Sequence, residues 1–170
     1  MNLNYSADQI NEWILQNEKI KRVFYQEIHP RFSDCIYNRK IHFSKYFEFF
    51  EMARFEIMLL FYDYLKEKKT SDAPPSLGNF VVVRASFESY PDLGLPVNGF
   101  VKIKTAFIIH HKPLLEFEQT AFTKSGNPCV KANIKIAIVN EKFEKIENWE
   151  RDILGAMLAF TNQYGKEETA

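Results

Sequence analysis

Hydrophobic and polar positions divide the chain into one long apolar helix and several alternating strands. The segment from Ser44 to Glu67 has large apolar residues on nearly every side of a helix, at ~100° per residue. Because one sheet face would bury only one stripe of such a helix, the pattern predicts a helix that a curved sheet encloses. The charged residues of the segment gather on one edge: Lys45, Glu48, Glu56, Asp63, Lys66 and Glu67.

Alternating apolar and polar residues predict strands on both sides of the helix. In the last of them, Ala132, Ile134 and Ile136 point one way while Lys131 and Lys135 point the other, as in a half-buried antiparallel strand. The Gly, Asn and Pro between 124 and 129 are typical of a hairpin turn. The predicted strands are Arg22–Phe32, Phe80–Glu88, Gly99–His110, Leu114–Thr123 and Val130–Asn140.

Capping residues predict a helix at each end of the chain. Ser6 and Gln9 form the pattern of a capping box at the start of a short helix. Asn148 is the expected cap of a final helix that runs to about Gln163 and ends at Gly165. The order of elements predicts an α+β fold in one domain of 170 residues. Within 1–170 we expect an N-terminal helical extension (1–20), a core (21–146) and a C-terminal helical extension (147–170).

Composition narrows the function classes. Lys plus Arg and Asp plus Glu both total 22, so no overall charge favours nucleic acid or an anionic membrane. The two cysteines, Cys35 and Cys129, are too few for a disulfide framework or a structural zinc site. Charged residues interrupt the apolar helix, which therefore reads as a core helix and not a membrane span. We expect a cytoplasmic protein that binds neither nucleic acid nor membrane, with no metal and no cofactor.

One arginine among the aromatic residues of the helix is the best indication of function. Arg54 projects away from the charged edge, and burial of its guanidinium is costly unless a carboxylate, a carbonyl or an anionic ligand meets its donors. Glu51, three residues earlier, is the nearest candidate partner. Two interpretations remain open: the pair is a structural brace, or Arg54 positions a reacting carbonyl or water with Glu51 as general base.

The segment Phe32–Glu56, FSDCIYNRKIHFSKYFEFFEMARFE, resembles the hotdog-fold thioesterases of the 4-hydroxybenzoyl-CoA thioesterase type. Tyr46, Glu51 and Arg54 fall in register with the family pattern, as do Phe49, Phe50 and Ala53. The resemblance implies a hotdog fold, homodimers or homotetramers, and an acyl-CoA or acyl-carrier-protein substrate bound between subunits. In this register Ile36 stands where many members have their catalytic aspartate. Thioesterases of enediyne polyketide biosynthesis also lack that acid, and they carry an arginine in register with Arg54.

The resemblance and the residue types together suggest a set of site residues. Arg54, Glu51, Asn38 and His42 are the catalytic candidates, and Tyr46, Phe43 and Phe50 are the substrate-binding candidates. His42 and Asn38 have ordinary alternatives as a helix cap and a turn residue. Unpaired N–H groups around 42–45, at the start of the helix, are a candidate site for the carbonyl oxygen. Cys35 has no base near it in sequence, and His110 and His111 read as a strand end and turn.

Three functions follow from this pattern. The first is hydrolysis of acyl-CoA or acyl-carrier-protein thioesters, in fatty-acid or polyketide metabolism. The second, suggested by Ile36, is an acyl-thioester binding module that does not hydrolyse its ligand. The third is another hotdog chemistry such as acyl transfer, whereas dehydration is disfavoured because the helix carries no matching histidine motif.

Overall fold

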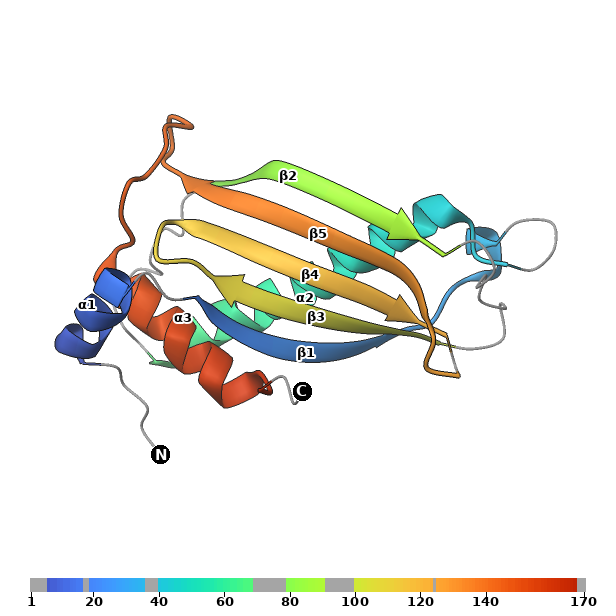
Figure 1. The fold of residues 1–170 in the computed structure, drawn as a ribbon, viewed down its shortest axis with the longest axis horizontal. Helices are drawn as coiled ribbons and strands as arrows, with labels where there is room; N and C mark the ends of the chain where they lie inside the picture. Colours follow the sequence, from blue (N-terminus) through green and yellow to red (C-terminus); the bar gives the residue numbers. More distant parts are fainter. Residues whose placement is uncertain are drawn as a thin grey trace.

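A curved antiparallel sheet lies across one long helix, α2 (Phe43–Lys68), in the computed structural model of the chain (Figure 1). The structure describes residues 6–16, 19–35, 40–68, 79–90, 100–123 and 125–167. The sheet has five strands in the order β1-β3-β4-β5-β2, and neighbouring strands are antiparallel. The predicted α+β arrangement is therefore confirmed. The strands are β1 (Ile20–Ile28), β2 (Asn79–Ser89), β3 (Val101–Ile109), β4 (Leu114–Phe122) and β5 (Pro128–Val139).

The first strand differs from its predicted position. We expected it to run to Phe32, but β1 ends at Ile28. Pro30, two residues later, has no backbone N–H to donate to a ladder and fixes its own φ, so the chain leaves the sheet before it. The short 3-10 helix η1 (Phe32–Asp34) follows and leads toward α2.

The sheet and α2 bury two apolar clusters side by side along the helix. Phe50 and Ala53 belong to the cluster near the start of α2, which includes Ile103 and Ala121 of the sheet. Farther along α2, Ile57 and Phe61 belong to the larger cluster. The sheet therefore covers one face of the helix, whereas Met52, Phe55 and Leu59 on another face are exposed.

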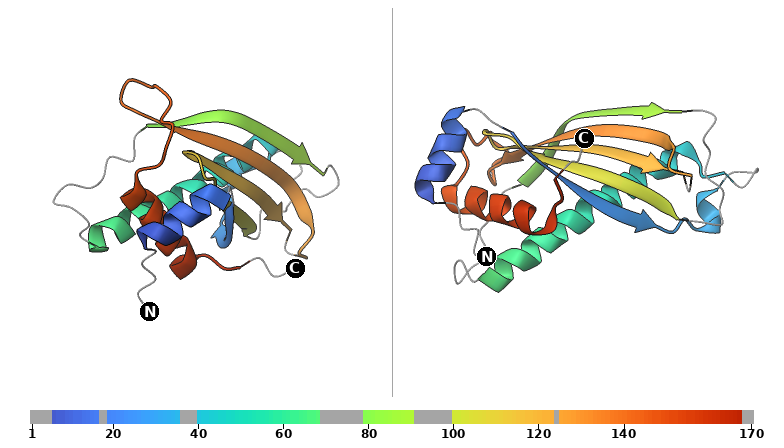
Figure 2. Two further views of the ribbon diagram at one scale, coloured as in Figure 1. Left: turned by 60° about the vertical axis from the view of Figure 1, so that its left-hand side comes forward. Right: turned by 60° about the horizontal axis from the view of Figure 1, so that its bottom comes forward.

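The last helix, α3 (Arg151–Tyr164), completes the larger cluster and lies beside α2 (Figure 2). The ring of Phe160 is fully buried and contacts Phe24 of β1 at 6.0 Å between centroids, and Phe61 and Tyr64 of α2 at 5.3 and 5.8 Å. These contacts fill the space beside the second half of α2. The first helix, α1 (Ala7–Gln16), contacts α3.

The predicted helix caps are confirmed in part. Ser6 and Gln9 exchange the two hydrogen bonds of a capping box, at 2.9 and 3.2 Å. Gly165 ends α3, and its N–H donates to Thr161 O. The prediction of Asn148 as the N-cap was wrong, because the cap is Glu150. Trp149 explains the shift: its buried indole donates to His110 O at 2.9 Å, which ties the segment before the helix to the sheet.

Among the described helices, none combines the length and the apolar character that a membrane-spanning helix needs.

Candidate functional site

Arg54 lies half-buried between α2 and the sheet, and its partner is a glutamine. Its Nη1 donates to Oε1 of Gln119, on β4, at 2.6 Å. Gln119 is buried and its Nε2 donates to Phe50 O at 3.0 Å and to Thr105 Oγ1 at 3.2 Å. The amide is therefore held in one orientation, and its oxygen faces the guanidinium.

The contact belongs to a buried polar network that crosses three neighbouring strands. Thr105 Oγ1 donates to Gln26 Oε1 at 3.3 Å, and Gln26 Nε2 donates to Ala53 O of α2 at 3.3 Å. Gln26, Thr105 and Gln119 are all buried. Buried polar side chains are costly unless they are hydrogen-bonded, so each member depends on the others. The network fixes the helix over the sheet at the turn that carries Arg54.

The expected brace between Glu51 and Arg54 was wrong as a direct contact. Glu51 is exposed, and no ion pair joins the two side chains within the described residues. Burial lowers the pKa of Arg54, and the nearby negative charge of Glu51 acts in the opposite direction. Sequence spacing selected the neighbour on the same helix, whereas a buried amide 65 positions away meets the guanidinium.

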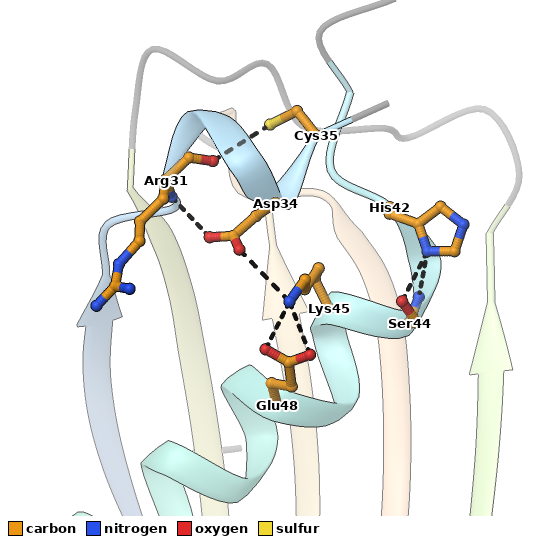
Figure 3. Close-up of polar contacts among 7 residues, drawn as sticks. All are labelled: Arg31, Asp34, Cys35, His42, Ser44, Lys45 and Glu48. Atoms are coloured by element: carbon orange, nitrogen blue, oxygen red, sulfur yellow. Dashed lines mark hydrogen bonds and ion pairs between the residues drawn. The ribbon is translucent and has the colours of Figure 1, made fainter. Parts of the chain in front are cut away.

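The N–H groups at the start of α2 are hydrogen-bonded to neighbouring groups of the chain (Figure 3). The ring nitrogen Nδ1 of His42 accepts the Ser44 N–H at 3.2 Å and lies 2.7 Å from Ser44 Oγ. The His42 N–H donates to Asp34 O and the Lys45 N–H donates to His42 O, each at 2.9 Å. Three of the four N–H groups that we considered for a carbonyl oxygen at 42–45 are thus occupied. His42 serves as a helix cap in this arrangement.

Carboxylates surround Lys45 beside that helix start. Figure 3 shows its Nζ between the carboxylates of Glu48 and Asp34. The Nζ lies 2.8 Å from Glu48 Oε1 and 3.7 Å from Asp34 Oδ1. The hydrogen bond with Glu48, followed by the charges of both acids, raises the pKa of Lys45. Asp34 also accepts the Arg31 N–H at 2.7 Å, so its carboxylate caps η1. Burial and the charge of Asp34 raise the pKa of Cys35, which disfavours a thiolate nucleophile there.

A cleft of about 620 Å³ opens on the other side of α2 from Arg54. One wall is the end of β1 and η1, and the other is α2, with Phe49, Met52, Phe55 and Leu59. None of the predicted site residues that the structure describes lines this cleft. Its charged lining is mostly acidic: Glu27, Asp34, Glu48 and Glu56 against Arg31 and Lys45. A cleft of this charge is poorly suited to the phosphates of coenzyme A.

The remaining candidates lie on the Arg54 side or beyond the described residues. Phe43 is partly exposed and meets Phe47 at 5.2 Å between ring centroids, and Phe47 in turn meets Phe87 of β2 at 4.1 Å. Tyr46 and Phe50 are buried in the cluster near the start of α2. Their contact with a substrate stays a prediction. Asn38 and Ile36 lie outside the described residues.

The structure also brings together residues that the sequence did not single out. Gln119 is the clearest case, since only its position opposite Thr105 in the sheet makes it a partner of Arg54. His110 and Glu116 form a second such pair, at 2.8 Å between Nε2 and Oε2. An amide or acid alone in a strand gives no sequence signal of this kind. In the described part of the chain, no group of His, Cys, Asp and Glu has the arrangement of a metal site.

Comparison with known proteins identifies the fold through solved structures and not through sequence. No family model and no curated protein matches the sequence. Solved structures do match: a predicted thioesterase from Bacillus stearothermophilus has a TM-score of 0.61 at 18% identity, over 84% of this chain and 96% of that one. The 4-hydroxybenzoyl CoA thioesterase from Pseudomonas sp. strain CBS-3 has a TM-score of 0.53 at 13% identity, over 79% and 99%. The chain has the hotdog fold.

A third hotdog structure was determined with ligands. The thioesterase from Thermus thermophilus, in complex with coenzyme A and zinc, has a TM-score of 0.58 at 16% identity, over 81% of this chain and 93% of that one. These similarities confirm the predicted fold, in which α2 is the central helix of the hotdog and β1 to β5 are its wrapping sheet. The identities are low, so the chemistry has to be argued from this chain's own residues.

Proposed function

We propose that this hotdog protein hydrolyses acyl thioesters of coenzyme A or of an acyl carrier protein. The observation that carries the proposal is the setting of Arg54. Its guanidinium is half-buried and forms one hydrogen bond within the described residues, through Nη1 to Gln119. The other N–H groups remain available to a ligand. A fixed cation in a partly desolvated position is suited to the negative charge that develops on a thioester carbonyl oxygen.

The reaction needs few groups. Water adds to the thioester carbonyl, the oxygen takes negative charge, and the C–S bond then breaks to give a carboxylic acid and a free thiol. In the proposed roles Arg54 binds the carbonyl oxygen and Glu51 takes the proton from the attacking water. Gln119 is a positioning residue, since it holds the guanidinium without reaching the substrate. Asn38 and His42 are proposed to orient the thioester, and Phe43, Tyr46 and Phe50 to contact its acyl or pantetheine part.

We further propose that a second copy completes this site by pairing along β2. The two edges of the sheet differ: β1 is covered at Val23, which exchanges two hydrogen bonds of 2.9 Å with Lys166. The β2 edge instead presents Val82 and Val83, which are 57% and 56% exposed. An apolar open edge favours strand addition. Because Phe87 of β2 packs on Phe47 of α2, a copy added there would lie on the Arg54 side of the helix.

The test is release of free thiol from a panel of acyl-CoA and acyl-carrier-protein substrates. Arg54→Met should lower kcat/KM by about 10²-fold or more, in line with the loss of one oxyanion donor. Arg54→Lys keeps the charge but not the planar fork, so it should restore little of the loss. Glu51→Gln should lower kcat, whereas Glu56→Gln, another exposed glutamate of α2, should not. Absence of thiol release from every substrate by the folded wild type would overturn hydrolysis.

One observation favours a second function, acyl-thioester binding without turnover. Glu51 is exposed and no described partner fixes its carboxylate, while Asp34 and Glu48 are engaged with η1 and Lys45. A general base that nothing orients is a weak catalyst. Calorimetric titration with a non-hydrolysable acyl-CoA analogue distinguishes the two. Binding that depends on Arg54, with no thiol released from the matching thioester, would support the binding module.

A further inference from the structure

The cleft beside α2 has an apolar wall that faces solvent. Met52, Phe55 and Leu59 line it and are 56%, 62% and 48% exposed. Figure 2 shows α2 at the surface of the molecule, on the side away from β2. Contiguous exposed apolar side chains are typical of sites where something binds. The cleft volume of about 620 Å³ lies within the ~300–1,000 Å³ of small-molecule sites. The cleft therefore has the size and the apolar lining of a site for a small molecule.

Two glutamates stand on opposite walls of this cleft. Glu27 belongs to β1 and Glu56 to α2. Gln26, which precedes Glu27, donates from Nε2 to Ala53 O at 3.3 Å and ties β1 to α2 there. Glu56 follows Ala53 by about one helical turn, so both acids lie close to this contact. Within the described part of the chain, neither carboxylate forms a hydrogen bond or an ion pair. Two carboxylates without partners are thus brought to one cleft from separate elements.

The other charged side chains leave the balance of the cleft negative. Lys45 is matched by Glu48 at 2.8 Å and by Asp34 at 3.7 Å. Arg31 is the second cation of the lining. Four carboxylates therefore stand against one lysine and one arginine, and two of the four are already engaged by the lysine. A cleft of negative charge raises the local concentration of cations and repels anions.

Glu56 combines this charge with the apolar wall. It lies four residues after Met52 and three before Leu59, which are the spacings of neighbouring side chains on a helix surface. A carboxylate bordered by apolar side chains has less water around it than one on an open surface, so its attraction to a cation is less screened. A ligand with both a positive charge and an apolar body would match the acid and the wall together.

We propose that the cleft binds a small amphiphilic cation, with its ammonium group between Glu27 and Glu56 and its apolar chain along the exposed wall of α2. The ammonium N–H groups donate to the two carboxylates, which gives both acids a partner. The chain covers apolar surface that water otherwise contacts. From Met52 to Leu59 the wall is about 10 Å long, which suits a chain of about eight carbons. The site is separate from Arg54, and the inference does not depend on the hydrolytic activity.

Calorimetric titration of the full chain with two matched probes tests the charge preference. n-Octylammonium and octanoate have the same chain length and opposite charges. The wild type should bind octylammonium at least about tenfold more tightly, because Glu27 and Glu56 attract the cation and repel the anion. The preference should shrink as salt is added. Equal affinity for the two probes, or no binding of octylammonium, would overturn the inference.

Substitution of the two acids tests the place of binding. Glu27→Gln and Glu56→Gln should each weaken octylammonium binding several-fold without weakening that of octanoate, and the double variant should lose the preference for the cation. Glu67→Gln is the matched control, because Glu67 is another exposed glutamate of α2 and does not line the cleft. It should keep the wild-type preference. Circular dichroism checks that each variant is folded. Octylammonium binding that persists unchanged in the double variant would place the cation elsewhere and refute the site.

A shorter cation tests the apolar wall. Ethylammonium keeps the charge and lacks most of the chain, so the wild type should bind it at least about tenfold more weakly than octylammonium. Phe55→Ser should narrow that gap. Leu60→Ser should keep it, because Leu60 is also exposed on α2 and does not line the cleft. If the wild type bound both cations alike, the acids would attract any cation and the proposed amphiphile site would be wrong.

A second copy of the chain is the alternative occupant of the apolar wall, and the same variants distinguish it. In that case the folded wild type would bind neither cation, and Phe55→Ser would lower the mass measured by sedimentation equilibrium. This result would also overturn the inference. A wild-type mass that Phe55→Ser leaves unchanged, together with selective binding of octylammonium, is the expected outcome.

Discussion

Thr105 and Gln119 lie directly opposite each other on β3 and β4, and the amide of Gln119 donates to the hydroxyl of Thr105 at 3.2 Å. A threonine and a glutamine are unusual occupants of the buried face of a sheet. Their pairing places an amide oxygen under α2, where Arg54 meets it. The sheet thus determines where the guanidinium stands.

Replacement of Gln119 tests the network that supports Arg54. Gln119→Leu removes the partner of the guanidinium and leaves Thr105 and Phe50 O with fewer hydrogen bonds. Because buried polar groups without partners are costly, the free energy of unfolding should fall by about 2 kcal/mol. Urea denaturation measures it. Thr120→Val, at the next position of β4, should change it by less than about 0.5 kcal/mol. Equal stability in both variants would show that the network contributes little.

The buried pair of His110 and Glu116 predicts a loss of stability in acid. Burial lowers the pKa of His110 below its ordinary 6.5, and the charges of Lys19 and Lys135 also lower it. The hydrogen bond and the charge of Glu116 act in the opposite direction but do not outweigh burial. Burial alone would raise the pKa of Glu116, but hydrogen bonds from Asn133 and His110 and the charge of Lys135 lower it overall. Below pH 6.5 the unfolded chain takes up the histidine proton more readily than the folded chain, so stability falls.

The measurement is the free energy of unfolding at about pH 7.5 and about pH 5.5, on either side of the ordinary histidine pKa. His110→Gln cannot titrate but keeps a donor for Glu116, so the difference between the two pH values should shrink. His111→Gln removes a neighbouring histidine that is less buried, and it should keep most of the wild-type difference. A difference that persists in His110→Gln would assign the acid sensitivity to other groups. The stability that ionised Glu116 contributes is lost at lower pH, below the ordinary glutamate pKa of 4.5.

Phe160 predicts how strongly α3 supports the central helix. The ring is fully buried among Phe24, Phe61 and Tyr64. Phe160→Ala should lower the free energy of unfolding by about 3–5 kcal/mol, because it leaves a cavity where three elements meet. Tyr164→Ala, at an exposed position of the same helix, should cost far less. Urea denaturation measures both variants. If Phe160→Ala lowered the free energy of unfolding no more than Tyr164→Ala does, the Phe160 ring would contribute little to the attachment of α3.

Gly165 predicts a steric requirement at the end of α3. A Cβ atom at this position would lie 2.6 Å from Arg22 Cβ and 2.6 Å from Thr161 O. Arg22 Cβ is fixed to the backbone of β1 and Thr161 O belongs to the backbone of α3, so neither atom can rotate away. Gly165→Ala should therefore force the chain end away from β1 and lower the melting temperature by several degrees. Gly126→Ala is a useful contrast, since no atom lies within 4 Å there and its cost would come from a φ of 86° alone. Hydrogen exchange at Val23 would report the displacement directly.

The sequence predicted the elements better than the contacts between them. Alternation along β5 and the apolar run of α2 are local patterns, and both elements appear within a few residues of their predicted ends. The partner of Arg54 could not be predicted in this way, because Gln119 approaches it only after β3 and β4 pair. The same holds for His110 and Glu116. Pairings across a sheet depend on register, which residue types do not specify.

The exposed apolar residues of α2 show another limit of prediction from the sequence. A helix that is apolar on nearly every side does not reveal which side the chain itself will cover. Phe50 and Phe55 are two phenylalanines of the same apolar run, yet Phe50 is fully buried under the sheet and Phe55 is 62% exposed. The side of α2 that stays exposed became visible only in the folded chain.

The short bridge between Val23 and Lys166 has a consequence for how many copies the sheet can recruit. A sheet with two open edges can add strands without end, and such growth leads to ribbons and aggregates. Here Lys166, from the chain's own C-terminal segment, is hydrogen-bonded to the β1 edge at Val23. Another strand therefore cannot pair with β1 at that position. Among the described strands, β2 is then the edge that is still open to another strand. In the proposed pairing, two copies that meet along β2 would each cover the open edge of the other, and the sheet would stop growing at a closed pair.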